Sequence, residues 1–294
     1  LLSADTIKIN SQGNGDLTNS GTIAGRSLVD IKADTINNLG GRISGGSVAL
    51  DAKADLNIIG GSIDARQKMT LDAGRDINIE TTTRSNAAGG GSATTVDQVV
   101  GLYVSNPGGS LKATAQRDFN LVGAVVSNAG NGGTDLIAKN DLNLKTVTES
   151  RTVSGVGAGH AMVATSSNEL GTTVTSGGTT TLKADRDIYV RQATVDAGQA
   201  ILSVNAGRDI TIEAGQRKES GAYSASWTDK GLASKTSNIF NGVYDNSTSV
   251  GSSFSGGSIA MTGRGTSSAS VDFQHQTTNA SGLREVCALP LRAE

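Results

Sequence analysis

The chain has 294 residues, of which 36% are hydrophobic, 18% are charged and only 3% are aromatic, and its net charge is −2. Lys and Arg are scattered along it, which argues against a nucleic-acid partner, and no run of about 18 apolar residues predicts a membrane-spanning helix. With 39 glycines and two prolines, the abundant Ile, Val, Leu and Thr are typical of β-strands joined by tight turns and too numerous for a disordered chain.

The chain begins at Leu1 in sequence that already looks like a repeat, without the basic and apolar regions of a signal peptide. We therefore expect a piece of a longer parent protein. Two degenerate units are expected around Asp5 and Asp34, because Asp34 precedes Asp55 by 21 residues and has Val29 five positions before it.

Six aspartates then mark an internal repeat, with spacings of 21, 42, 23, 46 and 22 residues. Apolar residues follow each aspartate one and three positions later, which predicts a strand with one buried face. An alanine lies three positions before each, which indicates an inward place too tight for a larger side chain. The aspartates are Asp55, Asp76, Asp118, Asp141, Asp187 and Asp209, and the alanines are Ala52, Ala73, Ala115, Ala138, Ala184 and Ala206.

A third apolar patch at Ile63, Val126 and Val195 gives each unit three short strands. The sequence therefore predicts an all-β, right-handed parallel β-helix over residues 1–275, built from coils of about 21 to 23 residues that stack about 4.8 Å apart. Aliphatic ladders would fill its lumen without aromatic residues. An outward polar ladder is expected from Asn57, Asn78, Asn120 and Asn143.

The six aspartates are expected at structural corners, where they accept hydrogen bonds from backbone N–H groups. A metal or catalytic row is disfavoured, because Arg75, Arg117, Arg186 and Arg208 directly precede four of them and would oppose a bound cation. We expect no cofactor.

Three excursions interrupt the repeat after every second coil, near residues 81–107, 146–177 and 214–255. Their Thr/Ser-rich openings and Gly-containing returns predict paired strands that leave the helix on one side. Aromatic residues on such protrusions are typical contact residues, and the candidates are Tyr103, Tyr223, Trp227, Phe240 and Tyr244. Alternatively, each packs locally on the flank of the helix.

Few residues indicate catalysis. His160 and His275 lack the partners of a metal site or a nucleophilic triad, and Cys287 alone forms no disulfide framework. Carbohydrate-active enzymes also use β-helices and paired carboxylates, and the candidate acids are Asp64, Asp72 and Asp196. A polysaccharide lyase or glycoside hydrolase is therefore the alternative to a non-enzymatic chain.

Residues 68–79 and 201–212, with their Ala-Gly-Arg-Asp-Ile core, resemble the haemagglutinin repeats of filamentous haemagglutinins and contact-dependent growth inhibition exoproteins. The resemblance covers about residues 1–275, and residues 276–294 depart from it as a junction, a truncation product or a disordered end. It implies two-partner secretion through an outer-membrane β-barrel transporter and display as a rod on the bacterial surface. It also implies a stalk that contacts a receptor, glycan or outer membrane of a target cell, for adhesion or for delivery of a C-terminal toxin.

Overall fold

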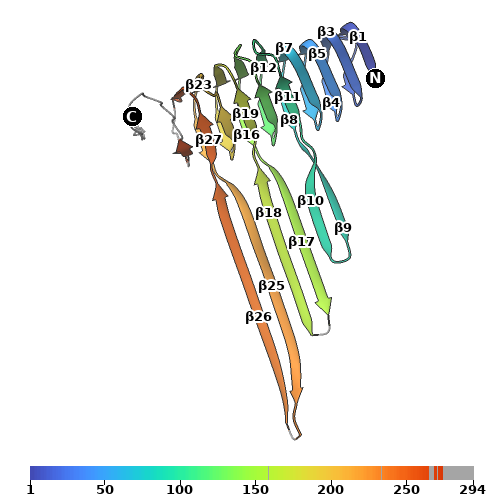
Figure 1. Ribbon diagram of the computed structural model, residues 1–294, viewed down its shortest axis with the longest axis vertical. Coiled ribbons are helices and arrows are strands. Elements are labelled where there is room, and N and C mark those ends of the chain that lie inside the picture. Colours follow the sequence, from blue (N-terminus) through green and yellow to red (C-terminus); the bar gives the residue numbers. More distant parts are fainter. Residues whose placement is uncertain (158, 233, 265–267, 270, 274–294) are drawn as a thin grey trace.

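The computed structural model describes residues 1–157, 159–232, 234–264, 268–269 and 271–273. The chain winds into a stack of parallel coils, and three long hairpins project from one side of it (Figure 1). We call these two regions the coil stack and the arm sheet.

One face of the coil stack is a nine-stranded parallel sheet, to which each coil contributes one short strand. Its strands alternate buried and half-buried residues, as expected when one side of a strand faces a lumen. In order they are β2 (Leu17–Asn19), β4 (Ile36–Leu39), β6 (Leu56–Ile59), β8 (Ile77–Glu80), β13 (Phe119–Val122), β16 (Leu142–Lys145), β21 (Ile188–Arg191), β24 (Ile210–Glu213) and β29 (Ser268–Ala269).

The other two faces belong to one 15-stranded sheet, because in the early coils a single strand bends through a register shift and covers both. These long strands are β1 (Leu2–Asn10), β3 (Thr22–Ala33), β5 (Arg42–Ala52) and β7 (Ser62–Ala73). Beyond β7 the second face continues as β11 (Gly101–Val104), β14 (Val125–Asn128), β19 (Thr173–Ser176), β22 (Thr194–Asp196), β27 (Ser252–Ser255) and β30 (Val271–Phe273). The third face continues as β12 (Ser110–Ala115), β15 (Thr134–Ala138), β20 (Thr180–Ala184), β23 (Ile201–Ala206) and β28 (Ser258–Thr262).

Every ladder in the coil stack is parallel, so the predicted parallel β-helix with three strands per coil is confirmed. The lumen is aliphatic, and the recurrent alanines face it: Ala73 pairs with Ala52 on one side and Ala115 on the other, and all three are at most 2% exposed. Phe119 and Phe254 are also fully buried there. The low aromatic content thus follows from a lumen too narrow for many rings.

The outward asparagine ladder is confirmed and is one residue longer than predicted. Asn57 donates from Nδ2 to Oδ1 of Asn37 at 2.8 Å, and Asn78 donates to Asn57 at 2.9 Å. Asn120 and Asn143 continue the chain at 3.0 Å each. Each side-chain amide therefore donates to the asparagine of the preceding coil, so this ladder runs along the same axis as the backbone hydrogen bonds between coils.

At the corners, five of the six aspartates, Asp55 to Asp187, each bond to the coil that follows. Oδ1 of Asp55 accepts a hydrogen bond from the backbone N–H of Asp76 at 3.2 Å, and this contact recurs down the stack to Asp187 and Asp209. The arginine before the next aspartate also binds the carboxylate, with Nε of Arg75 2.7 Å from Oδ1 of Asp55. Arg75 holds the pKa of Asp55 below its usual value against the opposing effect of burial.

The same arginine contact is made by Arg117 to Asp76, Arg186 to Asp141 and Arg208 to Asp187. One coil uses Asn140, which donates to Asp118 at 2.6 Å. The arginines that the sequence suggested only as repellents of a cation are therefore the partners of the preceding aspartate. The corner row is a ladder of links between coils.

The expected alignment of the first units was wrong. Ile36 pairs with Leu56, so Thr35 and not Asp34 lies at the corner position of Asp55. Val29 pairs with Val48, whereas the expected alignment would have paired it with Leu50, two positions later. Asp5 lies within β1 beside Ser27, whose hydroxyl donates to its carboxylate at 3.0 Å. The turn after Ala33 is one residue shorter than the later turns, so the 21-residue spacing between Asp34 and Asp55 does not join equivalent positions.

The arm sheet consists of three antiparallel hairpins side by side in the order β26-β25-β18-β17-β10-β9. The hairpins are β9 (Thr82–Ala88) with β10 (Gly91–Gln98), β17 (Val147–Gly157) with β18 (His160–Leu170), and β25 (Gly215–Lys230) with β26 (Lys235–Val250). All three leave the coil stack at the same corner, after β8, β16 and β24. Two coils span about 9.6 Å and two hairpin strands have the same width, so arms on alternate coils meet edge to edge.

The excursions are shorter than the sequence suggested. Residues 101–104 already pair with the coils on both sides as β11, and residues 173–176 and 252–255 do so as β19 and β27. Tyr103 therefore lies on the coil stack and not on an arm. Its ring covers Gly101, where a Cβ atom would meet the ring at 2.3 Å, so it packs on the flank of the helix.

Each arm begins or ends at a buried hydroxyl. Thr81 precedes the first arm and donates to the carbonyl of Gly123 at 2.6 Å while accepting from the N–H of Val100 at 3.1 Å. Thr172 and Ser252 follow the second and third arms and accept from the N–H groups of Ala124 and Ala193. These hydroxyls satisfy backbone groups that the departing arm leaves without a ladder partner.

Candidate contact surface on the arm sheet

The two faces of the arm sheet differ in chemistry, because directly opposed residues of an antiparallel sheet point the same way and neighbours along a strand point oppositely. Tyr223 is opposite Met162 on one side and Gly242 on the other. The face that contains Tyr223 is called the aromatic face. It carries His160, Met162, Tyr223, Trp227, Phe240 and Tyr244.

The aromatic face holds a contiguous group of rings over a small residue. Nδ1 of His160 lies 3.1 Å from the hydroxyl of Tyr223, and their ring centroids are 6.2 Å apart. Tyr223 lies 6.1 Å from Phe240, while Ala225 between them is buried. Trp227, Phe240 and Tyr244 are nonetheless 50 to 56% exposed. Exposed aromatic side chains gathered on one face are typical of contact surfaces.

The opposite face carries mainly serine and threonine on the arms, with four exposed aliphatic side chains, among them Val156, which is 89% exposed. Val163, Ile239 and Val243 are 46, 74 and 85% exposed. We call this the hydroxyl face. Neither face is covered by another layer of the described chain, so the arm sheet, unlike the coil stack, has no interior.

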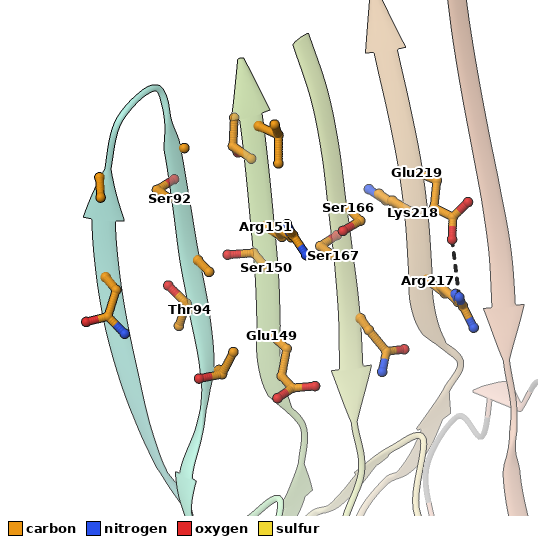
Figure 2. Close-up of a pocket in the computed structure, with 18 residues that line it drawn as sticks. Ser92, Thr94, Glu149, Ser150, Arg151, Ser166, Ser167, Arg217, Lys218 and Glu219 are labelled. Atoms are coloured by element: carbon orange, nitrogen blue, oxygen red, sulfur yellow. Dashed lines mark hydrogen bonds and ion pairs between the residues drawn. The ribbon is translucent and has the colours of Figure 1, made fainter. Parts of the chain in front are cut away.

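Near the coil stack, the arms border an open hollow of about 570 Å³, and Figure 2 shows the charged side chains that line it. Nη2 of Arg217 lies 3.2 Å from Oε1 of Glu219, and Glu149 accepts a hydrogen bond from the N–H of Val96 at 2.9 Å. Among the described residues no carboxylate lies within ion-pair distance of Arg151. The hollow therefore presents one guanidinium without a carboxylate partner.

Beyond the hollow, the arms carry an uncharged band. Residues 152–168, 220–228 and 236–244 contain no Asp, Glu, Lys or Arg, and charge returns only near the last tip at Asp229, Lys230 and Lys235. Nine residues of extended strand span about 30 Å. The rings of the aromatic face and the exposed aliphatic residues of the hydroxyl face all lie within these three segments. Such a large uncharged protruding surface is unusual unless it meets a partner.

An ionic cluster fixes the roots of the second and third arms to the coil stack. Arg191 donates from Nε and Nη2 to Glu169 at 2.8 and 3.0 Å, and from Nη1 to Glu213 at 3.0 Å. Glu169 is the second-to-last residue of β18. Its Oε2 also accepts a hydrogen bond from the N–H of Gln216 in β25 at 3.2 Å. Arg191 lowers the pKa of Glu169. The cluster therefore sets the position at which the two arms leave the helix.

The structure brings together four of the five aromatic residues proposed from the sequence, Tyr223, Trp227, Phe240 and Tyr244, and places Tyr103 elsewhere. His160, which appeared to have no partner, belongs with them. Its partner Tyr223 is 63 residues away on another arm, so only the pairing of the hairpins reveals the contact.

The candidate catalytic acids do not meet. Asp64 and Asp196 lie on the same ladder four coils apart, which is about 19 Å, and paired glycosidase carboxylates are at most about 9.5 Å apart. Asp72 lies on another ladder beside Asp51, which Lys32 holds at 3.1 Å. Burial, helped by Asp51, raises the pKa of Asp72. His275, Cys287 and the tail 276–294 lie outside the described residues.

Among the described residues, no group of three or more His, Cys, Asp or Glu could hold a metal ion. Within the same part of the chain, no helix is long and apolar enough to cross a membrane.

Comparison with known families gives a match to the model of the Hemagglutinin repeat family over residues 32–105 and 160–282. Comparison with curated proteins and with solved structures gives no match. The family is one of filamentous haemagglutinin-like surface exoproteins. Because the family match covers more than half of the sequence and the coil stack has the fold that such repeats predict, the chain belongs to the Hemagglutinin repeat family.

Proposed function

We propose that this chain is a non-enzymatic segment of a large secreted exoprotein on the bacterial surface, and that it meets a target cell through the arm sheet. The coil stack would serve as the stalk that positions the arms. The parent would reach the surface by two-partner secretion, and the contact would serve adhesion or the delivery of a C-terminal toxin.

The observation that carries the proposal is the uncharged band of the arms. Its half-exposed rings and aliphatic residues form a surface on both faces of a protruding sheet, whereas the outer faces of the coil stack carry ion pairs and the asparagine ladder. Burial of exposed apolar area is the main driving force for association. The expected contact is therefore with the outer membrane or an apolar part of a receptor at the target surface.

The proposal can be tested with vesicles prepared from bacterial outer membranes. The chain should co-sediment with the vesicles, and the double variant Trp227→Ser/Tyr244→Ser should bind at least ten-fold more weakly, because it removes two exposed rings from the aromatic face. The matched control is Tyr103→Ser on the coil stack, which should bind as the parent chain does.

Two outcomes would contradict the proposal: no binding of the parent chain to any outer-membrane vesicle, or equal loss of binding in the arm variant and in the control. Circular dichroism of each variant checks that the coil stack is intact. The rings of Trp227 and Tyr244 lie outside the lumen, so their loss should leave the fold unchanged.

A further inference from the structure

The corner that follows each strand of the nine-stranded sheet takes one of two forms. In the coils with an arm, the residue after the strand has no positive φ, and this residue is Thr81, Thr146 or Ala214. In the coils without an arm, from β4 onward, the residue at this position has a positive φ and turns the chain directly onto the second face. These residues are Gly40, Gly60, Gly123 and Gln192, with φ of 66, 60, 55 and 48°.

Glutamine is an unfavourable residue at this corner. Glycine adopts the left-handed conformation without strain, but Gln192 is the one other residue type that adopts it among the described residues. Such strain persists mainly where a residue is needed. Oε1 of Gln192 is also buried with no hydrogen-bond partner in the described part of the chain, which is a second unfavourable feature. A glycine, as at Gly123, would remove both, so the side chain of Gln192 is retained for its contacts.

Those contacts lie between the roots of the second and third arms. Nε2 of Gln192 donates to the backbone carbonyl of Glu169, near the end of β18, at 2.8 Å. Its Oε1 lies against Gly215, the first residue of β25. By strand alternation the residue after Arg191 would point into the lumen, but the left-handed turn directs Gln192 into the gap between the arms. One side chain of the coil stack therefore contacts both arms.

Two glycines leave the space that Gln192 occupies. A Cβ atom at Gly171, just after β18, would overlap with the backbone carbonyl of Gln192, and a Cβ atom at Gly215 would overlap with its side-chain amide. At the gap between the first and second arms the corner residue is Gly123, and Val147 of the second arm lies over it. The coil stack supplies the filling side chain only at the second gap.

The aromatic face crosses the boundary between the same two arms. His160 and Met162 belong to β18 and Tyr223 to β25, and these strands pair over His160–Asn168 and Arg217–Ala225. We propose that Gln192 is a positioning residue for the aromatic face, which holds the second and third arms at the spacing that aligns their side chains. Its part in a contact surface rests on the function proposed above, whereas the positioning of the arms does not.

Shortening the side chain by one methylene group tests this role. Asparagine tolerates the left-handed conformation, but Gln192→Asn should not reach both arms. Exchange of the backbone N–H groups near Asn168 and Arg217, at the root end of the β18–β25 ladder, should accelerate at least ten-fold. The lumen strands β21 and β24 should exchange as in the parent chain. No acceleration at the roots, or equal acceleration in the lumen strands, would overturn the proposal.

Gln216→Asn is the matched control. It makes the same chemical change one residue beyond Gly215, and among the described residues Gln216 bonds to Glu169 only through its backbone N–H. Its exchange rates should equal those of the parent chain. The same acceleration in Gln216→Asn and in Gln192→Asn would show that any shortened side chain near the root has this effect, and would also refute the positioning role.

A double-mutant cycle tests whether Gln192 fills the gap. Gly215→Ala should accelerate exchange at the arm roots at least ten-fold, because its methyl group overlaps with the amide of Gln192. In a Gln192→Gly background that space is empty, so the further effect of Gly215→Ala should fall to about two-fold or less. Equal effects of Gly215→Ala in the two backgrounds would contradict the proposal.

Binding to outer-membrane vesicles separates this role from the proposed function. Gln192→Asn should bind about three-fold more weakly than the parent chain, although every ring of the aromatic face is retained. Unchanged binding would overturn the part of Gln192 in the contact surface. Exchange that accelerates only at the arm roots supports the positioning of the arms even if the parent chain binds no vesicle, so the two failures are distinguishable.

Discussion

The coil stack and the arm sheet are both made of β-strands, but they are stabilised in different ways. In the coil stack, the inward hydrophobic residues from Val29 to Val204 line a closed lumen and are almost fully buried. In the arm sheet, both faces meet solvent, and Phe240 is 55% exposed where Phe119 of the lumen is 0% exposed. The same residue type therefore stabilises the fold in one region and forms surface in the other. Burial, not strand content, decides which role a residue has.

The sharpest way to break this comparison is to remove one ring from each region. Phe119→Ala should lower the free energy of unfolding by about 3 to 5 kcal/mol, because it leaves a cavity in a lumen that cannot collapse. Phe240→Ala, the matched control on the arm, should cost less than about 1 kcal/mol. Urea denaturation followed by circular dichroism measures both. Similar losses would show that the arm sheet is packed as tightly as the lumen.

Adding volume tests the same difference in the other direction. Ala73→Leu should overpack the lumen and cost about 1 to 3 kcal/mol, since Ala73 is 2% exposed between Ala52 and Ala115. Ala87→Leu on the exposed strand β9 should leave the melting temperature unchanged. An unchanged melting temperature for Ala73→Leu would contradict the narrow lumen.

The link between the regions can be cut at Arg191. Arg191→Met removes three charge-assisted hydrogen bonds to Glu169 and Glu213, and should reduce local protection by about 1 to 2 kcal/mol. Hydrogen exchange should accelerate at the roots of β18 and β25 and stay unchanged in the lumen strands. The control is Arg217→Met, whose ion pair with Glu219 is exposed. Equal acceleration throughout the coil stack would mean that the cluster stabilises the helix rather than the arms.

The smallest effect is expected at a corner. Arg208 lowers the pKa of Asp187, so the contact stabilises the fold above the usual aspartate pKa and is lost as the pH falls through the lower pKa of the folded state. At pH 7, Asp187→Asn should be less stable than the parent by under about 1 kcal/mol, and this difference should shrink as the pH falls below the usual aspartate pKa of about 3.9. Thermal melting across this pH range measures it. Asp118→Asn, where Asn140 replaces the arginine, should show a smaller difference.

The fold could be predicted because the lumen imposes a period on the sequence: one face of each strand must be apolar, and the alanine three positions before each corner aspartate repeats in all six coils. The first coils could not be aligned in the same way. The turn between Ala33 and Ile36 lacks one residue that the turn between Ala52 and Leu56 contains, and such a change is visible only from strand pairing.

The contact surface was less predictable. The sequence indicated which aromatic residues lie on protrusions, but the face each occupies depends on hairpin register, which brings Tyr223 opposite Met162. Tyr103 was misplaced because Leu102 and Val104 alternate with it like any half-buried strand. Only the pairing of β11 with β7 and β14 shows that this strand belongs to the coil stack.

The agreement between the width of a hairpin and the height of two coils limits how such a protein can change in length. Loss or duplication of one coil would displace the following arm by about 4.8 Å, half the width of a hairpin, and would open a gap or a clash in the projecting sheet. Copying two coils together with their arm leaves every strand pairing intact. Genes for such exoproteins should therefore gain or lose two coils and one arm together, because the rise of the helix fixes the spacing of the arms.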